Sequence, residues 1–277
     1  MTQCAERPDL QQSYIIQGSR VVQSGAGFPV ILIHGVAMDL TMWDEIERCL
    51  CPQFTIVRYD TIGHGPGDHP SGPYTIRQYA EQLNHITTCL GLDNFIIVGF
   101  SMGGLIAEEF TLCYPEKVAG LVVLSSVFAR STAERSAVMN RVREAEQATE
   151  FVGLTAGIER WFTPEFRADN APTVERVVAQ MKKNNLKSFA AAYRVFATAD
   201  AQILPRIGEI YCPVLSVTGE FDQRSTPAMA KQLAASVQSG ESIILQGQQH
   251  LIPIEKPQQV SEIIVNFVNR ISFKLKM

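Results

Sequence analysis

The sequence predicts an α/β fold with a mostly parallel central sheet flanked by helices, and with an all-helical segment inserted after the sixth strand. Short runs rich in β-branched residues alternate with amphipathic stretches of helical length, which is typical of parallel strands joined by helices. The last six runs are nearly continuous apolar segments, as expected for strands covered on both faces. The alternation stops once, between residues 127 and 207, where only helical patterns occur.

Eight strand candidates follow one another along the chain. The first two are SYIIQ and RVVQS, close to the N-terminus. The other six are residues 29–35, 54–60, 94–100, 120–126, 213–219 and 242–247. Helices are expected at residues 41–51, 75–90, 102–114, 225–238 and 257–270. The second helix carries an apolar stripe at helical spacing, formed by Ile76, Tyr79, Leu83, Ile86 and Leu90.

The inserted segment divides the chain into two predicted domains. Residues 1–126 and 208–277 form the α/β core, and residues 127–207 form a helical cap. The cap holds 12 of the 24 Lys and Arg residues and 9 of the 28 Asp and Glu residues, a net charge of +3 against −7 for the rest. A basic cap over a ligand site favours an anionic ligand, and the alternative is that these charges only solvate helix faces.

Composition and charge exclude several classes of function. The net charge of −4 argues against nucleic acid as a partner, and no apolar run approaches the roughly 20 residues that span a bilayer. The N-terminus lacks the features of a signal peptide, so we expect a loose leader at residues 1–12 and a cytoplasmic protein without a membrane partner. The six cysteines are scattered without metal-ligand spacing, so we expect reduced thiols, no metal and no cofactor.

The stretch GFSMGG, residues 99–104, lies between an expected strand and an expected helix. A G-x-S-x-G motif in this context turns the chain so sharply that the serine hydroxyl is held above the carboxyl edge of the sheet. Gly99 and Gly103 let neighbouring chain segments pass close by. The chemical interpretation is that Ser101 is a nucleophile, and the structural alternative is that serine and glycine only form a turn.

A serine hydroxyl is a weak nucleophile until a base takes its proton, and five histidines are candidates for that base. Four of them are interpreted as structural, unoriented or solvated: His34, His64, His69 and His85. His250 follows the last strand candidate, which puts it on the same edge of the sheet as Ser101. The sequence therefore predicts His250 as the base.

An imidazole in this role needs a carboxylate at its other ring nitrogen, which fixes the tautomer and stabilises the cation. Asp222 lies in the loop after the strand at 213–219, between Ser101 and His250 in the chain. Glu220 is the competing acid, but it follows the strand directly, where a side chain tends to point elsewhere. Asp222 is the predicted acid.

Together these features resemble the α/β-hydrolase superfamily of lipases and esterases, over about residues 14–272. The matching features are His34-Gly35 at a strand end, the YDTIGHG loop, the Gly99–Gly103 elbow, Asp222 and His250. In that family two backbone N–H groups hold the oxyanion of the tetrahedral intermediate, and such donors contribute about 3–4 kcal/mol each. The resemblance assigns these groups to Val36 and Met102, and it identifies the inserted helices as the cap domain of the family.

Two further stretches, HGVAMDLTMWDE and GIERWFTPEFR, are similar to the 3-oxoadipate enol-lactonase branch, whose members open a small lactone that bears a carboxylate. The prediction is a serine hydrolase that cleaves a small carboxylic ester or (enol-)lactone, with or without a carboxylate on the substrate, through an acyl-enzyme on Ser101. One alternative is a C–C or amide-bond hydrolase, or a cofactor-free perhydrolase, of the same fold. Another is a non-enzymatic receptor for small molecules on the same scaffold.

Two arginines of the expected cap sit among apolar residues, Arg160 beside Trp161 and Arg194 beside Tyr193. We expect Arg160, Trp161 and Arg194 to contact the substrate, with an unpaired arginine facing the pocket and orienting an anion. The alternative is that each arginine packs its stem on the cap and points its charged head outward.

Overall fold

The computed structural model describes residues 11–66, 70, 72–151 and 154–275; the expected leader up to residue 10 and His69 lie outside these ranges. Eight strands form one sheet: β1 (Gln12–Ile16), β2 (Ser19–Ser24), β3 (Phe28–Ile33), β4 (Phe54–Tyr59), β5 (Phe95–Phe100), β6 (Val118–Leu124), β7 (Val214–Gly219) and β8 (Gly240–Leu245). Their order in the sheet is β1-β2-β4-β3-β5-β6-β7-β8. The β1–β2 and β2–β4 pairs are antiparallel and the other pairs are parallel, so the predicted mostly parallel sheet is confirmed.

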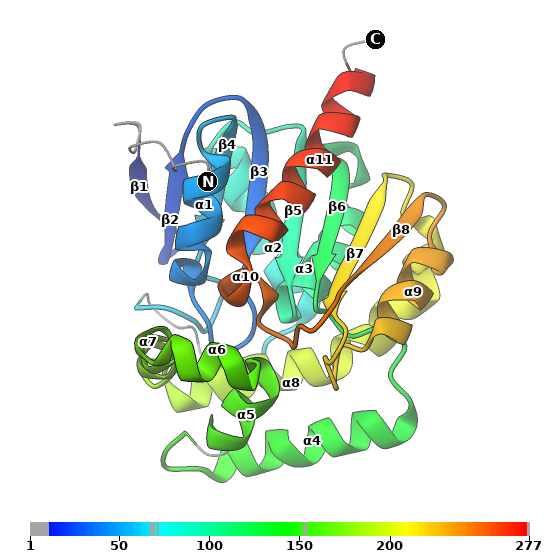
Figure 1. Ribbon diagram of the computed structural model, residues 1–277. Helices are drawn as coiled ribbons and strands as arrows, with labels where there is room; N and C mark the ends of the chain where they lie inside the picture. Colours follow the sequence, from blue (N-terminus) through cyan, green and yellow to red (C-terminus); the bar gives the residue numbers. More distant parts are fainter. Residues whose placement is uncertain (1–10, 67–69, 71, 152–153, 276–277) are drawn as a thin grey trace.

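Helices cover both faces of the sheet, as the alternation of strands and helices predicts (Figure 1). Outside the inserted segment they are α1 (Asp44–Leu50), α2 (Ile76–Cys89), α3 (Met102–Cys113), α9 (Pro227–Ser236), α10 (Ile252–Glu255) and α11 (Pro257–Leu275). Short 3-10 helices occur at η1 (Leu40–Trp43), η2 (Pro115–Lys117) and η3 (Leu204–Glu209). No helix of the described residues is long and apolar enough to cross a membrane.

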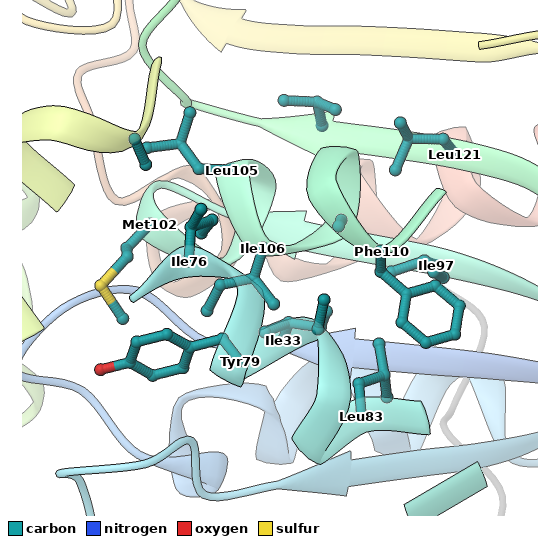
Figure 2. Close-up of a cluster of buried hydrophobic side chains, with 14 of the residues drawn as sticks. Ile33, Ile76, Tyr79, Leu83, Ile97, Met102, Leu105, Ile106, Phe110 and Leu121 are labelled. Carbon is teal, nitrogen blue, oxygen red and sulfur yellow. The ribbon is translucent and has the colours of Figure 1, made fainter. Parts of the chain in front are cut away.

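The described residues form two large apolar cores and one smaller cluster, and the first large core lies between the sheet and the helices α2 and α3. The helix α2 begins after Thr75, whose hydroxyl caps the backbone of Gln78, while the side chain of Gln78 bonds back to Thr75. Its predicted stripe is turned toward α3 and the strands, where burial of the apolar side chains stabilises the fold. Figure 2 shows this packing, with Ile76, Tyr79 and Leu83 of α2, Leu105, Ile106 and Phe110 of α3, and Ile33 and Ile97 of the sheet. The second core lies on the other face, beneath α1 and α11.

In the described part of the chain, five α-helices follow β6 and precede β7, which is the position predicted for the helical insertion. They are α4 (Thr132–Gln147), α5 (Leu154–Trp161), α6 (Pro164–Asp169), α7 (Ala171–Met181) and α8 (Leu186–Ile203). Figure 1 shows them gathered together below the sheet, with α4 packed along α8. The division into a core at 1–126 and 208–277 and a cap at 127–207 stays a prediction.

Glu108 is a buried carboxylic acid in α3, only 1% exposed, and its Oε1 atom has no hydrogen-bond partner within the described residues. Burial raises the pKa of Glu108 to about 8, from an ordinary value of 4.5, and the nearby Asp200 raises it further. Between pH 4.5 and about pH 8, Glu108 keeps its proton in the folded protein but has lost it in the unfolded chain. Because the unfolded state then binds fewer protons, the free energy of unfolding falls as the pH rises through this window.

Replacing Glu108 with glutamine is expected to remove this pH dependence, because a neutral amide has no proton to lose. The variant should gain stability relative to the wild type by up to about 1.4 kcal/mol per pH unit above pH 4.5, and the gain should level off above pH 8. Melting temperatures of both proteins between about pH 5 and pH 9 check this expectation. Two parallel curves would mean that Glu108 does not titrate in this range.

Candidate active site

Ser101 occupies the tight turn between β5 and α3. Its φ angle of 53° and ψ angle of −115° lie in a region that side chains rarely adopt, so the backbone is strained at this residue. Two hydrogen bonds hold the strained turn: the Ser101 N–H donates to the Leu124 carbonyl at 2.8 Å, and the Ser126 hydroxyl donates to the Ser101 carbonyl at 2.8 Å. The turn is thus anchored to the end of β6.

The glycines around Ser101 are required by close contacts between backbone segments. A Cβ atom on Gly99 would lie 2.2 Å from the Gly103 carbonyl oxygen, and one on Gly103 would lie 2.3 Å from the carbonyl oxygen of Ile33. Any side chain at either position would therefore push α3 away from the ends of β5 and β3. Glycine at these positions lets the first turn of α3 sit directly against the sheet.

His250 and Asp222 are brought together by the loops that follow β8 and β7. The Nδ1 atom of His250 lies 2.6 Å from Oδ2 of Asp222, which is hydrogen-bonding distance. The Oδ1 atom of Asp222 accepts the backbone N–H groups of Arg224 and Ser225, each at 2.9 Å. Asp222 is 3% exposed, so its carboxylate is fixed in place and shielded from water.

The competing acid, Glu220, makes a different contact. Its Oε2 atom accepts the backbone N–H of Gly247 at 2.8 Å, in the turn after β8. The contact with His250 is therefore made by Asp222, the residue that sequence order favours.

Ser101, Asp222 and His250 line one pocket of about 380 Å³. The structure records no hydrogen bond between Ser101 and His250 among the residues that it describes. In unliganded active sites such bonds are often long and tighten only when substrate binds. The ring of His250 packs against Phe100, with 5.0 Å between the ring centroids, which limits how far the imidazole can turn.

The two backbone groups expected to hold an oxyanion belong to segments next to Ser101. Val36 lines the pocket, and a Cβ atom on the preceding Gly35 would lie 3.2 Å from Cβ of Ser101, so this turn passes beside the serine. Met102 begins α3, where backbone N–H groups have no partner inside the helix. Neither N–H has a recorded acceptor within the described ranges. Their role as an oxyanion hole stays a prediction.

His34 and His64 hold the loop that carries Val36. The Nε2 atom of His64 accepts the backbone N–H of Ala37 at 3.0 Å, and Nε2 of His34 accepts the N–H of Thr61 at 3.0 Å. His34 is fully buried, and burial lowers its pKa, so the neutral form that accepts this hydrogen bond is favoured. Both histidines are engaged with the backbone, in agreement with the structural role that the sequence indicates.

Arg160 and Trp161 both line the pocket, and their contact with a substrate stays a prediction. No ion pair or hydrogen bond of the Arg160 guanidinium is recorded in the described part of the chain. Its pKa is lowered, first by burial and then by the positive charges of Arg224 and Arg141. All three arginines line the pocket, which Glu134, Glu144 and Glu150 also line. We call Arg160, Arg141 and Arg224 the arginine cluster, and an anion close to it would reduce the repulsion among its members.

Sequence reasoning missed Arg141 and Arg224. Arg224 lies two residues after Asp222, so its closeness in the chain to a predicted site residue is a signal that could have found it. Arg141 shares a face of α4 with Val138 and Ala145, which also line the pocket. The spacing of three and four residues between them is a signal that could have placed Arg141 on this face.

The prediction for Arg194 needs a correction. Its guanidinium forms an ion pair with Glu146, at 2.9 Å from Nε and 2.6 Å from Nη2, and its side chain is 43% exposed. Arg194 is not among the residues that line the pocket. The packing of α4 along α8 supplies Glu146 as a partner, so Arg194 is not the unpaired arginine that the sequence suggested.

The mostly parallel sheet, with a serine at the turn after β5, defines an α/β hydrolase. A family model described as "alpha/beta hydrolase fold" matches residues 29–257, and the chain belongs to this family. The predicted resemblance to the superfamily is thereby confirmed.

Two curated relatives and one solved structure extend this comparison. The (E)-2-((N-methylformamido)methylene)succinate hydrolase of Acinetobacter baylyi is 27% identical over 240 residues, 87% of this chain and 90% of the relative. The 3-oxoadipate enol-lactonase 2 of the same organism is 26% identical over 242 residues, 87% of this chain and 88% of the relative. The enol-lactonase structure from Burkholderia xenovorans LB400 shares the fold with a TM-score of 0.84 at 21% identity, covering 93% of this chain and 100% of that one. The protein is a hydrolase of the α/β fold.

Proposed function

We propose that the protein is a serine hydrolase that cleaves a small ester or lactone bearing a carboxylate, through an acyl-enzyme on Ser101. The observation that carries this proposal is the pocket lined jointly by Ser101 and the His250–Asp222 pair, whose Nδ1 and Oδ2 atoms are 2.6 Å apart. Because Nδ1 of His250 faces the carboxylate, Nε2 is the atom left to accept a proton from a hydroxyl. This is the arrangement that nucleophilic catalysis by serine requires.

In the proposed reaction Oγ of Ser101 attacks the carbonyl carbon while Nε2 of His250 takes the hydroxyl proton. The N–H groups of Val36 and Met102 stabilise the oxyanion, and Asp222 stabilises the imidazolium. The C–O bond of the substrate then breaks, and His250 returns the proton to the leaving oxygen. In a lactone this oxygen stays attached to the acyl chain. A water molecule, deprotonated by His250, attacks the acyl carbon. The bond to Oγ of Ser101 breaks, His250 returns the proton to Oγ, and the acid is released.

The arginine cluster supports a substrate with a carboxylate. A bound anion would offset the repulsion among Arg160, Arg141 and Arg224, and a guanidinium can bind a carboxylate with two parallel hydrogen bonds. The names of the two curated relatives denote a succinate derivative and a 3-oxoadipate enol-lactone, both of which are carboxylates. The receptor alternative is not favoured, because these relatives carry the names of hydrolases.

A hydrolysis panel tests the proposal. It combines small lactones, p-nitrophenyl esters and enol amides, each in a form with a carboxylate and a form without one. We expect repeated turnover of esters or lactones, with the carboxylate forms preferred. Repeated turnover of the enol amides alone would transfer the proposal to amide chemistry. A single burst, or no product in any class, would overturn it.

Replacing Arg160 with alanine is expected to lower kcat/KM for a carboxylate-bearing ester by roughly 30-fold, the usual loss of about 2 kcal/mol for a hydrogen bond to a charged group. The methyl ester of the same substrate should lose little, because it has no anion to bind. Arg194 offers a matched control, since it is an arginine of the same segment whose partner is Glu146. Arg194→Ala should not discriminate between the two substrates. Equal losses on both substrates in Arg160→Ala would show that Arg160 only supports the fold.

A further inference from the structure

A row of aromatic rings lines one wall of the pocket. Phe189, Tyr193 and Phe196 lie on one face of α8, at positions i, i+4 and i+7. The centroids of Phe189 and Tyr193 are 5.5 Å apart, those of Tyr193 and Phe196 are 6.0 Å apart, and the ring planes differ by only 24° and 19°. Phe151 extends the row beyond Phe189, at a centroid distance of 4.9 Å. We call Phe151, Phe189, Tyr193 and Phe196 the aromatic row.

The aromatic row is only partly buried, although its members are large apolar side chains. All four rings are intermediate in exposure, whereas the core aromatics Phe95, Phe100 and Phe110 are almost completely buried. The row is exposed because it borders the pocket that reaches Ser101. Apolar surface kept in contact with a cavity is a favourable binding surface for an apolar ligand group.

Helix packing alone accounts for part of the row. Tyr193 and Phe196 pack against Val138 and Val142 in a small apolar cluster between α4 and α8, so both rings also have a structural role. Phe189 does not belong to that cluster; it lies at the edge of the core on the α1 and α11 face of the sheet. The hydroxyl of Tyr193 accepts a hydrogen bond from Nε of Arg141 at 3.0 Å, and the part of its ring that is not packed on this cluster lines the pocket.

We propose that the substrate carries an apolar arm, an aryl or extended alkyl group, that lies along the aromatic row while its carbonyl carbon is at Ser101. This inference rests on the proposed function and extends it from a small carboxylate-bearing ester to an amphipathic one. The arginine cluster binds the anionic group and the row binds the apolar group. A pocket of about 380 Å³ is within the size range of sites that hold ligands larger than a simple acyl group.

Hydrolysis of two series of esters tests the inference. One series is p-nitrophenyl acetate, hexanoate and 4-phenylbutyrate, and the other is methyl, hexyl and phenethyl acetate. The wild type should prefer the long or aryl members of at least one series by about tenfold or more in kcat/KM. Phe189→Ala should lower that preference by about tenfold, and Phe189→Leu should restore part of it, because leucine returns apolar area. No preference in either series would overturn the inference.

Two control variants show whether a change in substrate preference comes from the aromatic row or from the loss of any aromatic side chain. Tyr193→Phe keeps the ring and removes the hydroxyl, so the preference for apolar arms should persist. Tyr211→Ala removes a 66% exposed aromatic ring that does not line the pocket, and it should leave the preference unchanged. A Tyr211→Ala variant that loses the preference as strongly as Phe189→Ala would contradict the assignment to the row.

A binding measurement keeps the inference distinct from the proposed function. In Ser101→Ala, the fluorescence of Trp161, which lines the pocket, reports binding, whereas Trp43 is fully buried elsewhere. Titration with 4-phenylbutyrate and with butyrate compares two carboxylates that differ by the phenyl group. We expect 4-phenylbutyrate to bind at least tenfold more tightly, and Phe189→Ala to reduce this ratio. Equal affinities would overturn the inference. If this ratio holds while the wild type turns over no ester or lactone, the inference stands and the proposed function fails.

Discussion

Replacing Ser101 with alanine is expected to lower kcat by about 10⁴-fold to 10⁶-fold, because the hydroxyl is the atom that bonds to the substrate in the proposed reaction. Ser101 makes its structural hydrogen bonds through its backbone N–H and carbonyl, to Leu124 and Ser126, and alanine keeps both groups. The variant should therefore fold normally, with an unchanged melting temperature. Initial rates on the best ester of the panel, with circular dichroism as the folding control, provide the measurement.

The decrease in kcat caused by Ser101→Ala and the decrease caused by His250→Ala should not be additive in free energy. If the two residues act as one unit, the double variant should be about as slow as either single variant. Multiplication of the two losses would indicate that they act independently. Near-normal activity in Ser101→Ala would remove the serine from the mechanism.

Replacing Asp222 with asparagine is expected to lower kcat by about 10⁴-fold, because the amide can present an N–H to Nδ1 of His250 and favour the wrong tautomer. The change is nearly isosteric, and a side-chain oxygen can still accept the N–H groups of Arg224 and Ser225. The pH dependence of kcat should also change, since the imidazolium loses its charged partner.

Glu220→Gln is the matched control for Asp222→Asn, because it neutralises the other carboxylate of the same loop. The Glu220 carboxylate bonds to the Gly247 N–H and not to the histidine, so this variant should retain most of its activity. An inactive Glu220→Gln together with an active Asp222→Asn would reassign the acid.

Residue patterns predicted the parts of the fold that depend on local periodicity. The short runs rich in β-branched residues located all eight strands, six of them as nearly continuous apolar segments, and the stripe from Ile76 to Leu90 located α2. The ends of elements were less predictable: α11 extends to Leu275, beyond the expected residue 270, and α10 is a single short turn between His250 and α11. Such ends depend on tertiary contacts as well as on apolar spacing.

The residues of the candidate site also differ in how well the sequence predicted them. Ser101, Asp222 and His250 follow strands β5, β7 and β8, so a parallel sheet brings them to one edge, and their positions along the chain were enough to propose them. The arginines lie on helices, where the partner of each charge depends on how the helices pack. Arg194 faces Glu146 across α4 and α8, whereas Arg160 faces Arg141 and Arg224, and nothing in the local sequence distinguishes the two cases.

The central claim is that Ser101 is an activated nucleophile, and covalent labelling tests it most directly. A fluorophosphonate forms an oxygen–phosphorus bond with an activated serine and releases fluoride, so the protein gains the mass of the phosphonyl group. Peptide mass spectrometry should find one adduct, on Ser101, at the rate at which activity is lost. The adduct should be absent in Ser101→Ala and formed far more slowly in His250→Ala. A wild-type protein that hydrolyses esters while Ser101 stays unlabelled, or that is labelled at another residue as activity disappears, would contradict the account.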